Sequence, residues 1–169
     1  MISKEELAWQ AGIMEGEGTI TIARSPRKNR PSYVFKAQID VCNTDIRLIL
    51  PFKESWGGYI HCHKDPRKEK KWKDVFTWHC SVNTATIFLR SLLPYMKAKH
   101  EVSKVVLEFL DYRSLFKHRF LRGGGKCGFR GSAPLSDEEI KHREYFWNKA
   151  RSLNPKGQYA RSLLNLKEA

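Results

Sequence analysis

The chain has 169 residues, enough for one domain with a sizeable core, and its 41% hydrophobic and 12% aromatic content excludes global disorder. A net charge of +13 indicates a polyanionic partner, with nucleic acid the first candidate and an anionic membrane the second. Apolar runs fall short of the ~20 residues that span a bilayer, and the N-terminus lacks a signal-peptide pattern. We therefore expect no membrane role and an intracellular location, in bacterial, archaeal or phage-host cytoplasm or in an organelle, with the four cysteines reduced.

The first part of the chain predicts two hairpins separated by helices. Residues 3–6 have the pattern of a capping box, and apolar residues then recur at helical spacing until Gly16 and Gly18 end the helix. Alternating polar and apolar residues predict strands over 19–23, 34–42, 59–63 and 75–82, with a short helix over 46–56 between the two pairs.

The second part predicts helices over about 84–93 and 97–112, a basic glycine-rich loop over 116–132, and a last helix from a second capping box at Ser136 to about Leu153. The order favours an α+β fold in which all helices cover one face of an antiparallel sheet. We expect residues 1–112 to form the core unit, and the loop and helix of 113–169 to pack on the same domain. The other sheet face would then be left polar, basic and uncovered.

Two features of the first helix indicate chemistry. Ala8, Gly12 and Gly16 form a stripe with almost no side chain, which suits close approach of another helix, within the chain or from a second copy, or else reflects glycines that the helix tolerates. Glu15 and Glu17 lie at the C-terminal end, where the helix dipole disfavours anions. Carboxylates in that position favour a hard cation such as Mg²⁺, with free backbone carbonyls as further ligands.

Residues 9–18, Trp-Gln-Ala-Gly-Ile-Met-Glu-Gly-Glu-Gly, resemble the LAGLIDADG signature of homing endonucleases in its acidic variant, with Gln10 and Met14 off-pattern. Similar stretches follow in the family's order at 41–45, 57–60, 76–78, 92–99, 105–109 and from Pro134 onward, so the resemblance covers roughly residues 5–155. It implies an αββαββα fold with a four-stranded, saddle-shaped antiparallel sheet. Because the motif occurs once, it also implies a homodimer whose signature helices meet along Ala8, Gly12 and Gly16.

The resemblance further implies a site-specific endonuclease that cuts a long, near-palindromic double-stranded DNA with short 3′ overhangs, encoded by an intron or a similar mobile element. Glu17 would bind Mg²⁺ (or Mn²⁺), helped by the Gly16 carbonyl. Lys99 would stabilise charge on the phosphate, with Lys97 as the alternative, and Asn43 would orient solvent. Two other readings stay open: a maturase that binds intron RNA, and a DNA-binding regulator that does not cut.

Strand alternation nominates the side chains that would read base edges in the major groove. These are Thr19, Thr21, Ala23, Lys36, Gln38, Asp40, Tyr59, His61 and His63, joined by Thr77 and His79 if Phe76, Trp78 and Cys80 face the helices. A shift of one residue in the alternation of this strand would place Thr77 and His79 on the helix side instead. The basic loops would contact phosphates through Arg24, Arg27, Lys28 and Arg30, and through Lys64, Arg67, Lys68, Lys70, Lys71 and Lys73. We reject a zinc site at His61–His63 with His79 and Cys80, because neighbouring strand residues point to opposite faces.

Overall fold

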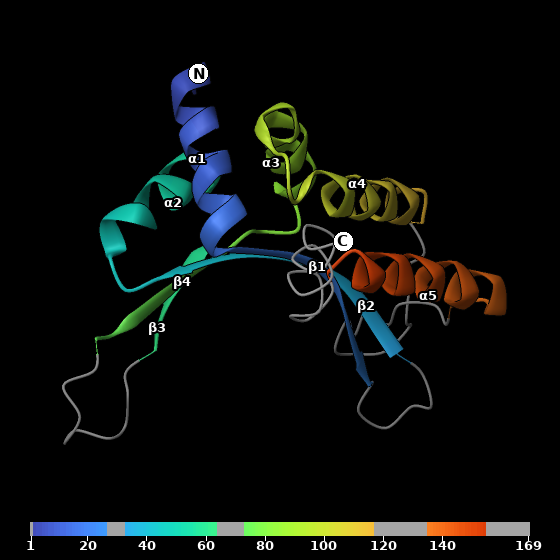
Figure 1. Cartoon of the computed structure of the whole chain (residues 1–169). Helices are drawn as coiled ribbons and strands as arrows, with labels where there is room; N and C mark the ends of the chain where they lie inside the picture. The colour runs from blue at the N-terminus through green and yellow to red at the C-terminus, as the bar shows by residue number, and fades with distance from the viewer. Residues whose placement is uncertain (1, 27–32, 64–72, 117–134, 155–169) are drawn as a thin grey trace, which may run out of the picture.

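The structure is a computed structural model that describes residues 2–26, 33–63, 73–116 and 135–154 (Figure 1). Its helices are α1 (Lys4–Glu17), α2 (Leu50–Trp56), α3 (Ala85–Leu92), α4 (His100–Ser114) and α5 (Asp137–Ser152), with 3-10 turns η1 (Ile46–Leu48) and η2 (Leu93–Tyr95). The strands are β1 (Gly18–Pro26), β2 (Tyr33–Asn43), β3 (Tyr59–His63) and β4 (Val75–His79). They form one antiparallel sheet in the order β1-β2-β4-β3, which confirms the predicted α+β fold.

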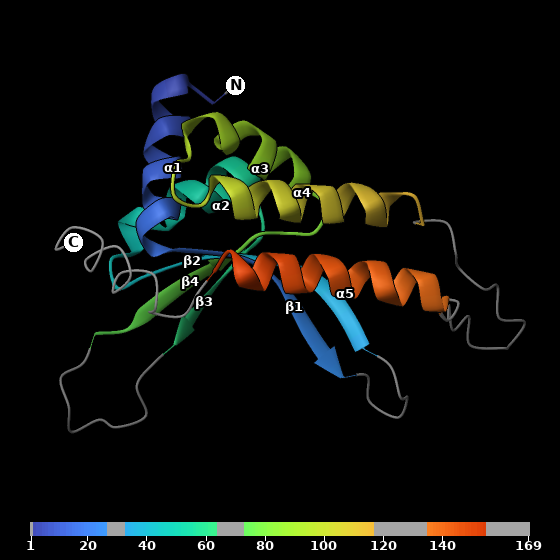
Figure 2. The same ribbon diagram turned by 45° about the vertical axis from the view of Figure 1, so that its right-hand side comes forward.

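The helices lie on one side of the sheet, and the two hairpins bend away from them on the other, so the uncovered face is concave (Figures 1 and 2). Strand alternation explains this arrangement. Ile20, Ile22, Ile39 and Val41 are buried beneath the helices together with Trp78, whereas their neighbours along the strands point outward. None of the described helices combines the length and apolar character that a membrane span needs.

Side-chain hydrogen bonds and a glycine determine where the helices begin and end. Ser3 caps α1 by accepting from the Glu6 N–H, but the Glu6 carboxylate accepts from Gln10 Nε2 at 2.8 Å, so the capping box predicted there is only half made. The second one, between Ser136 and Glu139, is complete. At the turn from α1 to β1, a side chain on Gly18 would overlap Met14, so this position accepts only glycine.

Four predicted elements differ in extent by more than one residue. β1 continues to Pro26, past the predicted end at Ala23. The helix expected over 46–56 divides into η1 and α2, because Pro51 lies in the first turn of α2 and has no N–H to continue a preceding helix. β4 ends at His79 rather than Val82, ahead of a turn in which Ser81 and Thr84 hydrogen-bond. α4 begins at His100 rather than about Lys97, because the preceding N–H groups bond to α1.

α5 packs against α4 and β1, and the two helices lie side by side in Figure 2. Ala150 of α5 is fully buried in the same hydrophobic core as the residues of α1 to α4. Beyond the helix, Asn154 Nδ2 donates to the Ile20 carbonyl of β1 at 2.9 Å. The C-terminal helix therefore contributes to the core that supports the sheet.

Candidate active site and strand-face interface

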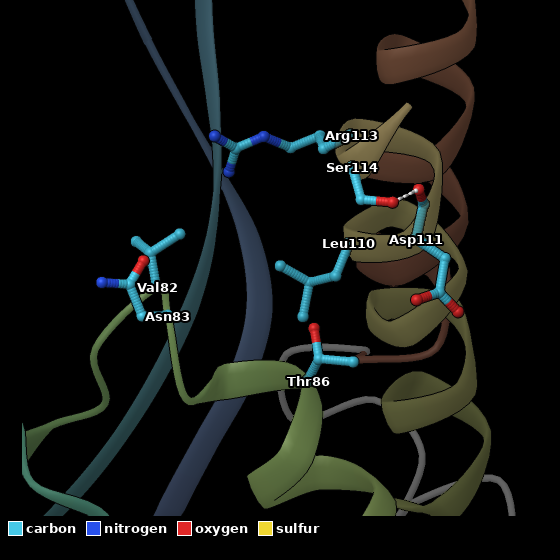
Figure 3. Close-up of a pocket in the computed structure, with 7 residues that line it drawn as sticks. All are labelled: Val82, Asn83, Thr86, Leu110, Asp111, Arg113 and Ser114. Carbon is cyan, nitrogen blue, oxygen red and sulfur yellow. Dashed lines mark hydrogen bonds between the residues drawn. The ribbon is translucent and has the colours of Figure 1, made fainter. Parts of the chain in front are cut away.

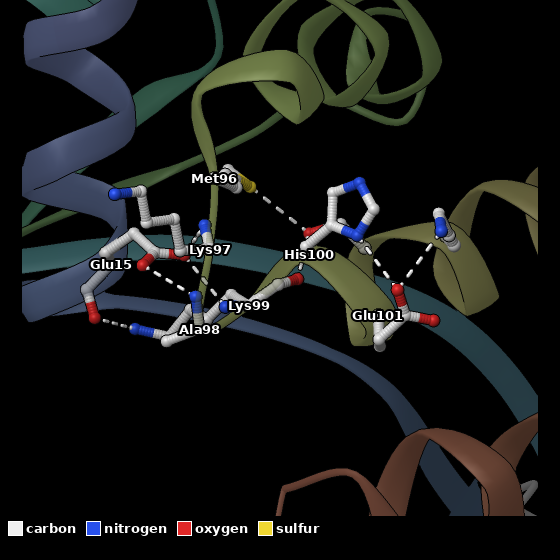
Figure 4. Close-up of polar contacts among 9 residues, drawn as sticks. Glu15, Met96, Lys97, Ala98, Lys99, His100 and Glu101 are labelled. Atoms are coloured by element: carbon white, nitrogen blue, oxygen red, sulfur yellow. Dashed lines mark hydrogen bonds and ion pairs between the residues drawn. The ribbon is translucent and has the colours of Figure 1, made fainter.

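Glu15 ties α1 to the start of α4 (Figure 4). Its carboxylate accepts from the backbone N–H groups of Lys97, Ala98 and Lys99 at 3.1, 2.9 and 2.8 Å. Partial burial works to raise the pKa of Glu15, but these three N–H groups and the Lys99 charge outweigh it and lower the pKa below its usual value. Glu15 is thus an ionised residue already engaged by the protein, a role that the sequence did not reveal.

The Lys99 ammonium group lies at the last turn of α1. Its Nζ donates to the Met14 carbonyl at 2.9 Å and also to the Glu15 carbonyl. Burial lowers the pKa of Lys99, and the negative charges of Glu15 and Glu17 partly oppose that shift. Lys97, the alternative, is exposed. The ammonium group that contacts α1 is therefore that of Lys99.

Glu17 is the last residue of α1 and is exposed to solvent. The described part of the chain contains no group of three or more His, Cys, Asp or Glu side chains that could hold a metal ion. Asn43 is occupied differently: its Oδ1 accepts from the Asp45 N–H at 2.8 Å and shapes the turn after β2. A solvent-orienting role for Asn43, and a ligand role for the Gly16 carbonyl, stay predictions.

The strand register fixes which residues share the uncovered face. Asp40 lies opposite His79 and Tyr59 is also opposite His79, whereas Trp78 is fully buried beneath the helices. The orientation of β4 left open by the sequence is therefore settled, and Thr77 points outward with His79. The nominated residues Thr19, Thr21, Ala23, Lys36, Gln38, Asp40, Tyr59, His61, His63, Thr77 and His79 all share this face.

Asp40 organises the middle of this face. Its two oxygens bond Gln38 Nε2 and His79 Nδ1, each at 2.7 Å, and Tyr59 stacks on the His79 ring at a centroid distance of 4.7 Å. With Lys36, these residues line a hollow of about 240 Å³. Polar side chains here are held in place by one another, which is what recognition of base edges requires.

Arg24 requires a correction. It has the strand parity of Ile20 and Ile22, so it points to the helix side, where its guanidinium lies 3.7 Å from the Tyr33 ring centroid and 4.9 Å from that of Trp147, and 3.7 Å from Glu144. We therefore remove Arg24 from the phosphate-contacting set. Lys73 is exposed, as phosphate contact needs. The predicted contacts Arg27, Lys28, Arg30, Lys64, Arg67, Lys68, Lys70 and Lys71 lie outside the described residues.

The stripe of Ala8, Gly12 and Gly16 is exposed along α1. A Cβ atom built on Gly12 or Gly16 would meet no heavy atom of the described chain within 4 Å. Close packing inside the chain, one of the readings of the stripe, is therefore excluded for the described residues. The bare helix surface is open to a second helix.

A second hollow of about 450 Å³ lies at the far end of α4 from Lys99, between that end and the start of α3 (Figure 3). Asp111 in its wall is paired with Arg90 at 2.9 Å, and burial lowers the pKa of Arg113. The Ser114 hydroxyl in the lining donates to the Asp111 carbonyl at 2.7 Å. Its lining residues are Val82, Asn83, Thr86, Leu110, Asp111, Arg113 and Ser114.

No protein-family model and no curated protein matches the chain. Solved structures do. The homing endonuclease I-CvuI, with the I-CreI target uncleaved in 2 mM Mg, shares 17% identity over 92% of this chain and 85% of its own, with a TM-score of 0.64. The archaeal intron-encoded homing endonuclease I-Vdi141I, complexed with DNA, shares 14% over 90% and 86%, with a TM-score of 0.65. The LAGLIDADG homing endonuclease I-GzeII, complexed with its DNA target, shares 13% over 66% of this chain but 37% of its own, with a TM-score of 0.52.

The chain has the LAGLIDADG homing-endonuclease fold. Within that fold, α1 carries the residues that resemble the signature, and the structure brings Lys99 to the helix end that holds Glu17. Asn43 is tied into its own turn instead. For Glu15, the sequence indicated a cation as partner, whereas the structure gives it the backbone N–H groups that precede α4. Its only signal in the sequence was an acid placed against the helix dipole, which did not reveal its partner.

Proposed function

We propose that this chain is a homodimeric DNA endonuclease that cuts both strands of a long, near-palindromic target by metal-dependent phosphodiester hydrolysis, leaving short 3′ overhangs. The observation that carries the proposal is that an exposed acid, Glu17, and the Lys99 ammonium group, which is held by the Met14 carbonyl, lie at the same end of α1, from which β1 enters the concave sheet. A net charge of +13 suits a polyanionic substrate. The LAGLIDADG fold agrees with both.

Glu17 and the Gly16 carbonyl would hold Mg²⁺ or Mn²⁺, because carboxylate and carbonyl oxygens are the ligands that such ions prefer. A bound ion of this kind lowers the pKa of a water molecule and stabilises the leaving oxygen. The Lys99 ammonium group, held at the end of α1, would offset the negative charge that builds on the phosphate.

The strand face would read the target. Gln38, Asp40 and His79 are held together at its centre, and hydrogen-bonding side chains of this kind distinguish bases by their edges in the major groove. Lys36 and Lys73, both exposed, would contact phosphates and make binding fall with salt.

A second copy would complete the site. The exposed Ala8, Gly12 and Gly16 stripe allows two α1 helices to approach closely, which would bring the two Glu17 side chains together. The match to I-CvuI spans 92% of this chain and 85% of I-CvuI, whereas the match to I-GzeII spans 66% of this chain and 37% of I-GzeII. We infer from the open stripe that another copy supplies the second half-site.

The test begins with selection of a cleavable target from a randomised DNA library in Mg²⁺. On that target, Glu17→Gln should abolish cleavage while DNA binding is kept or tightened, because the substitution removes the anionic ligand without changing its size. Glu54→Gln, an exposed acid of α2, is the matched control and should cleave normally. Strong Mg²⁺-dependent cleavage by Glu17→Gln would reject the site. A maturase or a non-cleaving regulator would be indicated if no target is cut and intron RNA or DNA binding is unaffected by the same substitution.

A further inference from the structure

We propose that Glu15 is a positioning residue for the proposed nuclease reaction: its carboxylate fixes the segment of residues 97–99 and thereby holds the Lys99 side chain at the end of α1 beside Glu17. The inference rests on the proposed function, because it assigns a role through Lys99. Glu15 itself contacts no substrate in this proposal. Figure 4 shows the contacts that carry it.

Both oxygens of Glu15 are used by one short segment. Oε1 accepts from the Lys97 and Lys99 N–H groups at 3.1 and 2.8 Å, and Oε2 accepts from Ala98 at 2.9 Å. These N–H groups immediately precede α4, where helix starts leave donors without partners inside the helix. A carboxylate is favoured at such a start by the helix dipole, whereas at the end of its own helix it is not. Glu15 thus joins two helix ends whose partial charges complement each other.

Lys99 is then fixed along its whole length. Glu15 accepts from its main-chain N–H, and its carbonyl accepts from Ser103 through both N–H, at 3.0 Å, and Oγ, at 2.7 Å. Its ammonium group returns to α1 and donates to the Met14 carbonyl at 2.9 Å and to that of Glu15. An ammonium group has three N–H bonds, so among the described residues these contacts leave one for a substrate oxygen. That one is set in a defined direction.

The carboxylate is the group this arrangement requires. Glutamine at position 15 would keep the length but replace one acceptor oxygen with an NH₂ donor, which would face a backbone N–H donor. At least one of the contacts to Lys97, Ala98 or Lys99 would be lost, and the segment that carries Lys99 would loosen. A misplacement of about 1 Å at a reacting group reduces rates by on the order of 100-fold.

A double-mutant cycle of Glu15→Gln and Lys99→Met tests this. Single-turnover cleavage of the selected target is measured at saturating DNA and Mg²⁺, below the melting temperature of every variant, together with the Kd for DNA. We expect Glu15→Gln to slow cleavage by on the order of 10- to 100-fold with little change in Kd. In the Lys99→Met background, Glu15→Gln should not slow cleavage any further. It should lower the melting temperature by the same amount in both backgrounds.

The inference would be overturned if Glu15→Gln cleaved at the wild-type rate. It would also be overturned if the double variant were slowed by the product of the two single-variant effects. Full cleavage by Lys99→Met alone would instead overturn the role of Lys99 in the proposed function, so the two failures are distinct. If Glu15→Gln does not fold, Glu15→Asp serves in the same cycle, because it keeps both oxygens on a shorter side chain. Glu15→Asp should slow cleavage in the wild-type background but not in the Lys99→Met background. Glu54→Gln is the control for loss of an exposed charge.

Discussion

Substitution of Gly12 should affect the stability of the single chain and the formation of the proposed dimer in opposite directions. Gly12 lies inside α1, is exposed, and a Cβ there meets no described atom within 4 Å. Glycine inside a helix costs about 1 kcal/mol relative to alanine, and leucine is nearly as good a helix former as alanine. Gly12→Leu should therefore stabilise the isolated chain by somewhat under about 1 kcal/mol. For a chain of this size, that corresponds to a rise in melting temperature of about 2–4 °C.

The same substitution should destroy the dimer. It adds a branched side chain to each copy at the centre of the Ala8, Gly12 and Gly16 stripe, so the two α1 helices could no longer approach closely. Sedimentation at micromolar concentration should show a folded monomer, thermal denaturation should show no loss of stability relative to the wild-type monomer, and cleavage should be lost. Lys104→Leu adds the same side chain to an exposed position of α4 and should stay dimeric and active.

A dimeric Gly12→Leu protein that cleaves normally would refute the assignment of α1 as the interface. Unfolding of the variant as a monomer would refute the reading that the space around Gly12 is open within the chain.

Three further results are expected. Gln10→Leu, which restores the usual motif residue, should lower the melting temperature, because Gln10 Oε1 accepts from buried Trp56 Nε1 at 2.6 Å and an unpaired buried donor costs about 1–3 kcal/mol; equal stability would contradict this. The folded pKa of Glu15 lies below its usual 4.5, so its stabilising contribution is present above that value and lost as pH falls through the lower pKa. The melting-temperature gap between wild type and Glu15→Gln should accordingly close below pH 4.5, and a constant gap would argue against an ionised Glu15. Asp40→Asn should leave cleavage intact but alter base preference where Gln38 and His79 contact the target, by about 1–3 kcal/mol in a randomised-library selection. An unchanged preference at every position would show that Asp40 does not organise the face.

Periodicity was enough to predict the sheet. Apolar residues at every second position placed Ile20, Ile39 and Val41 under the helices, and the structure agrees. At Arg24 two sequence signals conflict. Alternation places it with Ile20 and Ile22, whereas the basic loop that follows favours phosphate contact, and the structure follows the alternation.

Contacts between distant segments were beyond sequence reasoning. Gln10 departs from the motif because its side chain is buried against Trp56 and Ser55 of α2, and nothing near Gln10 in the chain indicates those partners. Glu15 likewise bonds N–H groups more than eighty residues away, at a helix start whose location depends on the bond itself. The charge pattern showed that an acid at this helix end needed a positive partner, but it did not distinguish a metal ion from backbone donors.

The hydrogen bond from Asn154 to the Ile20 carbonyl lies at the edge of the sheet formed by β1. β1 is an outermost strand, and outermost strands carry backbone groups that can recruit a strand from another molecule and begin aggregation. Asn154, just after α5, occupies one such carbonyl, and α5 packs along β1. The uncovered sheet face, where DNA is proposed to bind, thus lies beside an edge strand that is partly protected. That protection would help the chain stay dispersed during the interval between synthesis and capture of its target.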